Sequence, residues 1–362
     1  MTRRLPDDDG VHSSPGELAE LTELERVLAL GGRFLEHRVV REIVAGEHRF
    51  AVHAITLGNP QADVPAVGFF GGVHGLERIG SDVLLHYLRG LVMQLQWDSL
   101  LQRQLESLRM VFMPIVNPGG MWRGTRANPN GVDLMRNAPV DAAQRALFLI
   151  GGQRISANLP WYRGLSGAPM EPEAAALCEV VEQELLPREF SIAIDCHSGF
   201  GLTDRVWFPY ACTTQPFAHL AEVHQFTHIF EQAHPHHRYV FEPQSRQYLA
   251  HGDLWDYLHR KTRPGHTFIP LTLEMGSWLW VKKNPRQLLS RQGFFNPQIE
   301  HRQQRVLRRH VALLDFAARS ACSHRGWMAF GSVRDEHTKQ ALARWYPHLP
   351  GAPVHPPVLD PP

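Results

Sequence analysis

The chain has 362 residues, a formal net charge of +1 with histidine neutral, 43% hydrophobic residues and 20% charged residues. These values are ordinary for a soluble globular protein and leave enough apolar area for one large α/β domain or two small ones. A net charge this close to zero gives no electrostatic argument for binding nucleic acid or an anionic membrane surface. No run of about 18 apolar residues occurs, so the sequence predicts no membrane-spanning segment.

The first 15 residues are polar and contain two prolines and three consecutive aspartates, so we expect them to be disordered. They lack the apolar core that a signal peptide needs. The four cysteines are scattered without paired spacing, which favours isolated reduced thiols over a disulfide framework. Together these features predict a cytoplasmic protein.

Extended and helical patterns alternate along most of the remaining chain. Helical periodicity over 18–30 stops at Gly31-Gly32, and two short strands at 39–44 and 49–57 predict a hairpin. Further predicted strands lie at 64–70, 110–116, 190–194, 205–210 and 267–273, and further predicted helices lie at 79–95, 171–186, 216–232, 254–259 and 303–321. We therefore expect one α/β domain over 16–325, with a mixed, mostly parallel twisted sheet of about eight strands flanked by helices. Residues 326–362 are expected to form a C-terminal extension with a proline-rich, irregular tail.

Four of the predicted buried strands end in polar side chains that suit metal binding or acid–base chemistry. His74 and Glu77 follow the first of these strands, and Asn117 follows the second. His197 ends the third strand and Glu274 ends the fourth. Open α/β sheets bind ligands at the carboxyl ends of their strands, so we expect a shared pocket there.

Two histidines and one carboxylate form the three-ligand zinc site of catalytic proteins, which leaves a fourth position for water. His74, Glu77 and His197 match that set. Glu274 would then lie beside the water as a general base, because zinc lowers the pKa of bound water to about 7.

Each of these residues also has an ordinary structural explanation when it is considered alone. His74 could cap the following helix, Glu77 could be a first-turn acid placed against the helix dipole, and His197 could be a buried histidine with satisfied hydrogen bonds. Their joint placement with Glu274 favours the metal site.

The same His-x-x-Glu spacing recurs twice in the helix predicted over 216–232, at His219–Glu222 and at His228–Glu231. Neither pair follows a buried strand. We interpret both as part of a solvated helix face.

The stretch from 117 to 170 shows no periodicity and is rich in Gly, Pro, Asn and Arg. Loops of this length in a compact domain are usually functional or disordered. Arginine offers bidentate geometry to a carboxylate and a hydrogen-bond donor to a developing oxyanion. Arg123, Arg126 and Arg136 would be interpreted as a surface patch if the metal motif were absent.

Six motifs occur in a fixed order: His-x-x-Glu, Trp-Arg-x-Thr-Arg at 122–126, Gly-Val-Asp-x-x-Arg-Asn at 131–137, a strand-terminal His, Tyr-x-Ala-x-Gly-x-x-x-Asp at 248–256, and a strand-terminal Glu. In this order and spacing the sequence resembles the zinc carboxypeptidase family over roughly residues 65–280. Each motif is weak alone, but six in sequence are specific.

The resemblance implies a single zinc ion held by His74, Glu77 and His197. Glu274 would be the general base and would later pass its proton to the leaving amine. Asp133 would orient His74 through the second ring nitrogen, although a role in a turn is the alternative for Asp133.

The resemblance also implies how a substrate is held. Arg126 would stabilise the tetrahedral oxyanion, and Arg136 would bind the free carboxylate with Asn137 beside it. Tyr248 would close over the substrate and donate a hydrogen bond.

Two positions depart from the family pattern. Met135 stands where the family motif has an asparagine that contacts the terminal carboxylate. Trp255 precedes the aspartate of the fifth motif, where the family has a residue that shapes the side-chain pocket. A bulky indole there gives no support for selecting Lys or Arg side chains.

The sequence thus predicts a zinc metallocarboxypeptidase that hydrolyses an amide bond next to a free C-terminal carboxylate, with a peptide or an N-acyl amino acid as substrate. One alternative is an N-acyl-amino-acid deacylase of the succinylglutamate desuccinylase and aspartoacylase type, which shares the His-x-x-Glu and His core. Tyr248 and the Trp-Arg-x-Thr-Arg segment favour the peptidase. A metal-binding module that has lost catalysis is a further alternative, and Glu274 and Arg126 argue against it.

Overall fold

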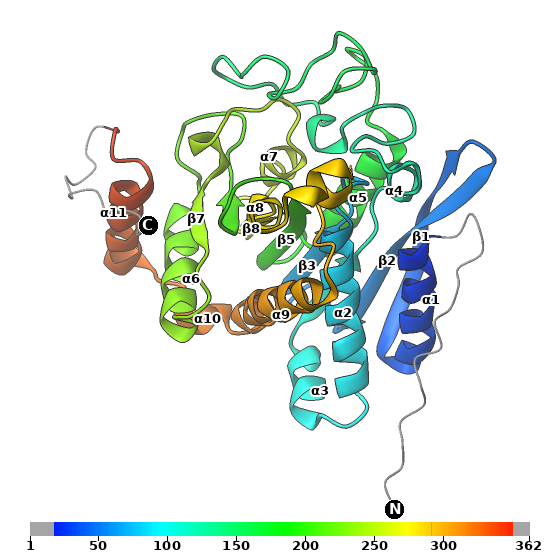
Figure 1. Ribbon diagram of the computed structural model, residues 1–362. Helices are drawn as coiled ribbons and strands as arrows, with labels where there is room; N and C mark the ends of the chain where they lie inside the picture. Colours follow the sequence, from blue (N-terminus) through cyan, green and yellow to red (C-terminus); the bar gives the residue numbers. More distant parts are fainter. Residues whose placement is uncertain (1–17, 291, 350–362) are drawn as a thin grey trace, which may run out of the picture.

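The computed structural model describes residues 18–290 and 292–349. Its centre is an eight-stranded sheet with the order β1-β2-β4-β3-β5-β8-β6-β7 (Figure 1). The strands are β1 (Leu35–Ala45), β2 (His48–Gly58), β3 (Ala66–Gly71), β4 (Arg109–Met113), β5 (Phe190–Ser198), β6 (Arg205–Phe208), β7 (Val240–Pro243) and β8 (Thr267–Met275). The predicted α/β fold with a mixed, mostly parallel sheet is confirmed.

The four central strands β4, β3, β5 and β8 run parallel to one another. The predicted hairpin forms from β1 and β2, which pair antiparallel, and β2 also pairs antiparallel with β4. At the other side β6 runs antiparallel to β8 and parallel to β7. Every residue of β3, β4, β5 and β8 is buried, which explains why these segments appear as continuous apolar runs in the sequence.

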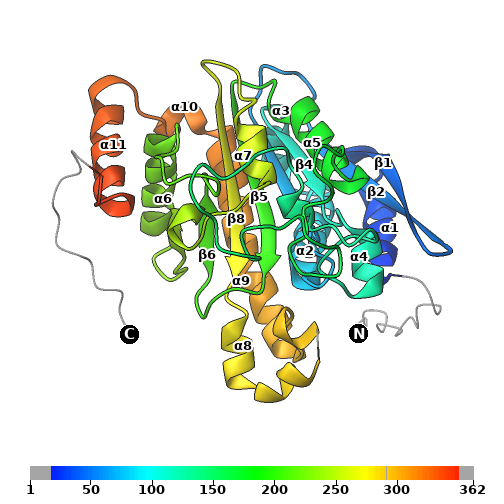
Figure 2. The same cartoon turned by 90° about the horizontal axis from the view of Figure 1, so that it is seen from above.

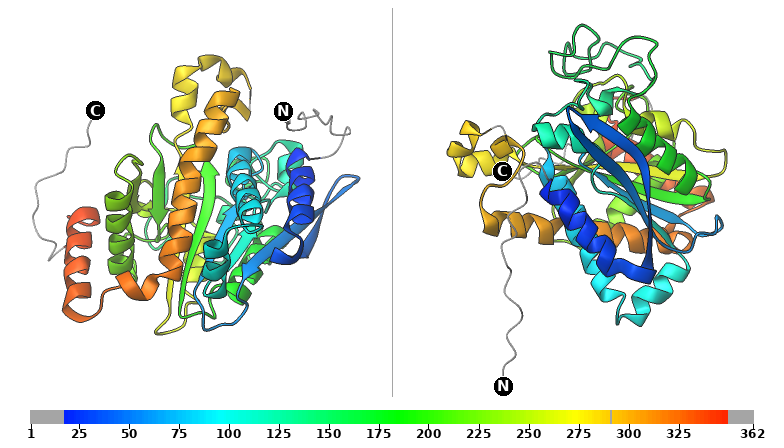
Figure 3. Two further views of the ribbon diagram at one scale, coloured as in Figure 1. Left: turned by 90° about the horizontal axis from the view of Figure 1, so that it is seen from below. Right: turned by 90° about the vertical axis from the view of Figure 1, so that its right-hand side faces the viewer.

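Helices cover both faces of the sheet (Figures 2 and 3). The longer helices are α1 (Ala19–Gly31), α2 (Arg78–Gln94), α3 (Ser99–Glu106), α5 (Pro172–Glu184), α6 (Leu220–Ala233), α9 (Glu300–Cys322) and α11 (Gly331–Trp345). The short helices are α4 (Pro118–Arg123), α7 (Leu254–His259), α8 (Trp278–Lys283) and α10 (His324–Trp327). None of the helices in the described ranges is both long and apolar enough to cross a membrane.

Alternate side chains of each central strand enter two separate hydrophobic cores, as the period of two in a strand requires. In β3, Val67 and Phe69 belong to the core on one face, which also contains side chains of α1, α2, α6 and α9. Ala66 and Phe70 pack with α5 and α7 on the other face. The site described below lies at the carboxyl ends of the strands between these two layers.

The C-terminal extension contains α11, which packs against α6. Trp345 is buried and its indole N–H donates to the carbonyl of Phe241 over 2.7 Å. Arg334 of α11 pairs with Glu222 over 2.7 Å, and Glu222 is buried. The interpretation of His219–Glu222 as a solvated face was therefore wrong, whereas His228 is exposed as expected. Residues 1–15, which were predicted to be disordered, and residues 350–362 of the proline-rich tail lie outside the described residues.

A close approach of α2 to the sheet generates the first prediction. A Cβ at Gly80 would lie 2.3 Å from the carbonyl oxygen of Cys196 in β5, whereas a Cβ at Gly90 of the same helix would meet nothing within 4 Å. We expect Gly80→Ala to lower the free energy of unfolding by about 1–3 kcal/mol, because the backbone must move to relieve the clash. Gly90→Ala is expected to raise it by about 0.5–1 kcal/mol through helix propensity.

Urea denaturation of the two variants and the wild type measures this difference. Equal effects of the two alanines would show that α2 does not approach β5 as closely as the structure has it.

Candidate active site

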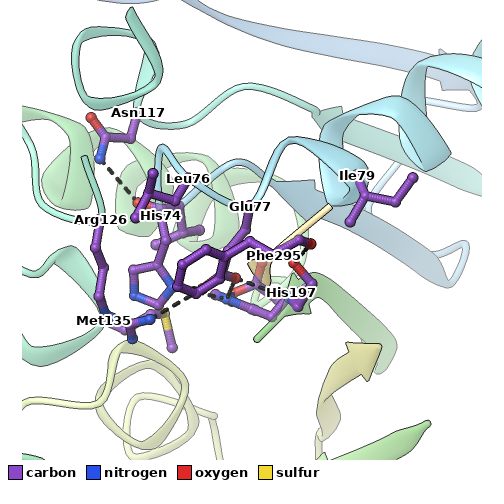
Figure 4. Close-up of polar contacts among 12 residues, drawn as sticks. His74, Leu76, Glu77, Ile79, Asn117, Arg126, Met135, His197 and Phe295 are labelled. Carbon is purple, nitrogen blue, oxygen red and sulfur yellow. Dashed lines mark hydrogen bonds and ion pairs between the residues drawn. The ribbon is translucent and has the colours of Figure 1, made fainter. Parts of the chain in front are cut away.

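The loop between β3 and α2 carries His74 and Glu77, and its path depends on close backbone contact with the start of α4. A Cβ at Gly75 would lie 2.1 Å from the carbonyl carbon of Gly120. Asn117 holds the two segments together, since its Oδ1 accepts from the N–H of Gly120 (2.8 Å) and its Nδ2 donates to the carbonyl of Val73 (3.2 Å; Figure 4). The expectation that Asn117 shares the pocket is corrected, because its side chain is used within this junction.

His197 reaches the same place from β5. It is the register partner of Glu274 on the neighbouring parallel strand β8. His74, Glu77 and His197 each offer one ligand atom, these atoms lie within 4.8 Å of one another, and all three residues are buried. Figure 4 shows the three side chains converging beneath Phe295. The fold thus brings His74 and His197, which are far apart in the sequence, to one place as predicted.

Carboxylates on the far side of each imidazole fix the orientation of both rings. Nε2 of His74 lies 3.1 Å from Oδ1 of Asp133, and Nε2 of His197 lies 2.7 Å from Oδ2 of Asp195. An ionised carboxylate only accepts hydrogen bonds, so each Nε2 is placed to donate to its carboxylate, and each Nδ1 would present a lone pair to a bound cation.

Those two Nδ1 atoms lie 3.2 Å apart, and the Glu77 carboxylate lies 2.9 Å from one and 3.0 Å from the other. Two lone pairs and a carboxylate cannot share this space without a positive charge between them. Two imidazole nitrogens and one carboxylate oxygen suit zinc, and the carboxylates behind the rings complete the usual arrangement. The residues therefore fit the metal.

Burial by itself would raise the pKa of Glu77, but His74 and His197 hold that pKa well below its ordinary value. Burial likewise opposes the protonation of His197, yet Asp195 and Glu77 raise its pKa well above the usual range. Both shifts show that positive charge on the imidazole side of the cluster stabilises the Glu77 and Asp195 carboxylates.

Arg126 joins the same network. Its Nε donates to Oδ2 of Asp133 over 2.9 Å, and its Nη1 lies 3.1 Å from Oε1 of Glu77. Asp133 is buried, but Arg126 and His74 hold its pKa well below the ordinary value. One carboxylate therefore positions both a metal ligand and the arginine expected to stabilise an oxyanion, and Asp133 also caps the short 3-10 helix at Leu134–Arg136.

Glu274 faces the same cavity and is 7% exposed. Burial, followed by the negative charge of Glu77, raises its pKa to about 8. A carboxyl group with a pKa near neutrality can both accept and return a proton, as a general base requires.

Arg136 and Tyr248 line the same cavity as the metal ligands. Nη2 of Arg136 donates to the hydroxyl of Tyr248 over 3.4 Å, and the guanidinium carbon lies 5.7 Å from the centre of the tyrosine ring. Met135 also lines the cavity, so its thioether lies where the family pattern has an asparagine amide.

The cavity has a volume of about 480 Å³. Most of the remaining wall is apolar and includes Leu147, Ile150, Trp161, Phe200, Trp207, Trp278, Phe294 and Phe295. The rest of it is Gly199 and four uncharged polar residues, Ser198, Gln244, Gln247 and Thr272. Several of the apolar residues come from segments far from every motif, so no sequence signal pointed to them.

Two predicted substrate-binding residues do not line the cavity. Asn137 donates to the carbonyl of Arg163 (3.0 Å) and accepts from the N–H of Glu171 (2.6 Å), so its amide braces the loop. Trp255 is 3% exposed and its indole N–H donates to Asp195 over 3.0 Å. The predicted substrate-binding role of both residues is therefore replaced by a structural one: Asn137 holds the loop and Trp255 contacts Asp195.

Asp195 is the site residue that sequence reasoning missed. It stands two residues before His197 in β5, so both side chains lie on one face of the strand. An acid at that spacing from a strand-terminal ligand is the signal that could have found it.

The raised pKa of Glu274 generates a prediction about the metal-depleted protein. Above its ordinary pKa of 4.5, the unfolded chain has released the proton that the folded protein still holds up to about pH 8. This group therefore makes folding stability fall as pH rises from about 4.5 to about 8, with no further change above that. Glu274→Gln should lose this slope, as measured by urea denaturation in the presence of a chelator.

Glu42→Gln is the matched control, because Glu42 is 66% exposed. Its pH dependence should parallel the wild type. A Glu274→Gln protein with the same slope as the wild type would contradict the assignment of this group.

Comparison with known proteins agrees with this geometry. Carboxypeptidase SOL1 of Arabidopsis thaliana is 36% identical over 75 residues, covering 21% of this chain and 15% of that protein. Carboxypeptidase D of Anas platyrhynchos is 23% identical over 184 residues, covering 48% of this chain and 11% of that protein. The chain therefore matches only a small part of the length of these relatives.

Solved structures show a similar fold at low sequence identity. Thrombin activatable fibrinolysis inhibitor superimposes with a TM-score of 0.62 at 17% identity, covering 86% of this chain and 77% of the other. Carboxypeptidase A from Helicoverpa armigera gives 0.62 at 17% identity, covering 83% and 71%. A model of the zinc carboxypeptidase family matches residues 49–284, which is more than half of the chain. The chain belongs to the zinc carboxypeptidase family.

Proposed function

We propose that this protein is a zinc carboxypeptidase that hydrolyses the last peptide bond of a substrate with a free C-terminus. The observation that carries the proposal is one cavity that holds the metal-ligand set, the buried Glu274 and the guanidinium of Arg136. Membership of the zinc carboxypeptidase family supports the same activity.

His74, Glu77 and His197 would hold a zinc ion, which would supply a Lewis acid for the substrate carbonyl and would lower the pKa of water. Glu274, at the cavity wall, would accept a proton from the attacking water and return a proton to the leaving amine. Arg126, fixed by Asp133, donates to the oxygen on which negative charge develops. Arg136 binds the terminal carboxylate, and Tyr248 lies against the Arg136 guanidinium at the same end of the cavity.

The cavity wall supports a preference for uncharged, apolar C-terminal side chains. Apart from the metal ligands, Glu274, Arg126 and Arg136, every residue that lines it is uncharged. The nearby acid Glu242 is already paired with Arg205, and it also accepts hydrogen bonds from Trp207 and Gln247. A lysine or arginine side chain would enter without a free partner, and burying an unpaired charge is strongly unfavourable.

We also propose a cytoplasmic location. The four cysteines are free thiols, and three of them are buried. Cell fractionation would test this location directly.

Glu274→Gln is expected to lower kcat/KM by about 10³-fold or more, because the proton carrier is lost while the shape of the side chain is kept. The zinc content of the purified variant should equal that of the wild type. Turnover of blocked dipeptides, measured together with metal analysis, checks both statements. Near-full activity of this variant would rule out the mechanism.

Arg136→Ala is expected to raise KM about 100-fold for peptides with a free C-terminus, since a charge-assisted bidentate contact is lost. The ratio of kcat/KM for free acids to that for the matching C-terminal amides should collapse. Arg136→Lys should retain part of the ratio through its charge. An unchanged ratio in Arg136→Ala would overturn the role of this residue, and faster turnover of N-acyl amino acids than of peptides by the wild type would overturn the proposed substrate.

A further inference from the structure

We infer that Trp255 is a positioning residue for the metal centre, and that it acts through Asp195 on His197. The inference rests on the metal centre of the proposed function. It assigns to Trp255 a different task from the shaping of the side-chain pocket that its place in the motif suggested.

The contact chain runs from α7 to β5 through fully enclosed groups. Oδ2 of Asp195 accepts from Nε2 of His197 over 2.7 Å and from Nε1 of Trp255 over 3.0 Å. Asp195 is 0% exposed. Among the described residues its other oxygen, Oδ1, has no hydrogen-bond partner, so the two N–H donors converge on one oxygen. Rotation of this carboxylate would break both contacts.

The indole is held rigidly in its place. Asp253 caps α7 and accepts from the backbone N–H groups of Trp255 and Asp256, both over 2.9 Å. The Trp255 ring packs against Phe70 with ring centres 5.1 Å apart. Because the backbone cap and the core contact both fix the indole, its N–H is directed at Asp195 before any metal binds.

The two metal-ligand histidines are supported in chemically different ways. Asp133, behind His74, has a second partner that is a cation, because Arg126 donates to it over 2.9 Å. Asp195, behind His197, has the neutral indole, and within the described residues no arginine or lysine forms an ion pair with it. A neutral donor orients a carboxylate without cancelling its charge, so the charge of Asp195 remains available to the imidazolium-like ring of a metal-bound histidine.

The neutral partner of Asp195 predicts separate roles for Asp195 and Trp255. Asp195 makes His197 a stronger ligand, and the Trp255 N–H keeps Asp195 in the geometry that does so. Loss of such supporting hydrogen bonds lowers metal affinity by about 10–100-fold in zinc proteins.

The test uses Trp255→Phe in the full-length protein, which removes the N–H and keeps an aromatic ring. We expect the Kd for zinc, measured by competition with a chromophoric chelator, to rise about 10-fold. Trp345→Phe is the matched control, because Trp345 is also buried and its N–H donates to the carbonyl of Phe241 over 2.7 Å, in the core beneath α11. Its Kd should equal that of the wild type.

A second variant tests whether Trp255 affects zinc affinity through Asp195. Asp195→Asn should raise the Kd for zinc by 10-fold or more, and adding Trp255→Phe to it should cause no further rise, because the indole acts only through the carboxylate. The visible spectrum of the Co²⁺-substituted protein should change in Trp255→Phe and not in Trp345→Phe, a signature that altered packing alone would not give.

A Trp255→Phe protein with the zinc affinity and Co²⁺ spectrum of the wild type would overturn this inference alone. Additive losses in the double variant would also overturn it. A wild-type protein that binds no zinc would overturn the proposed function, and the inference with it.

Discussion

The Nδ1 atoms of His74 and His197 lie 3.2 Å apart beside the carboxylate of Glu77, and this arrangement depends on a positive charge between them. Most of the neighbouring structure serves to maintain it. β3 and β5 are adjacent parallel strands, so their carboxyl ends deliver the two histidines to one edge of the sheet. The His74 loop then has to pass close to α4, and only glycine at position 75 permits that contact.

Two carboxyl groups, Glu77 and Glu274, line one enclosed cavity because their surroundings favour different protonation states. Glu77 remains ionised because the two histidines stabilise its charge, whereas burial and the charge of Glu77 keep a proton on Glu274 up to about pH 8. When the surroundings of two carboxyl groups give them very different pKa values, the two groups commonly have different chemical roles. Here one acid is suited to hold a cation and the other to move a proton, although they stand on neighbouring parts of the same sheet edge.

The fold and the central site were accessible from the sequence because they depend on local patterns. Fully buried parallel strands produce continuous apolar runs, and the residue that ends each run must lie at the edge where ligands bind. Asp195 could also have been found, since a period of two places it behind His197. The packing of α11 on α6 was not accessible, because its pattern is weak and the burial of Glu222 depends on Arg334, more than a hundred residues away. The prediction that Asn137 and Trp255 line the substrate pocket was wrong for a related reason. A motif gives the position of a residue in the chain, whereas tertiary packing decides which way its side chain points.

The segment from 248 to 256 links the two halves of the site. Tyr248 contacts Arg136 at the end that would bind the substrate carboxylate, and Trp255 contacts Asp195 behind the metal ligand. Between them, a Cβ at Gly252 would lie 1.8 Å from the carbonyl oxygen of Arg136, so the backbone of this segment is pressed directly against the arginine. Met135 cannot donate a hydrogen bond to a substrate carboxylate, so recognition of that group falls on Arg136 and on the segment that fixes it. The position of one short segment therefore controls both the orientation of His197 and the placement of Arg136, the cavity-lining arginine that does not contact the metal ligands or Asp133.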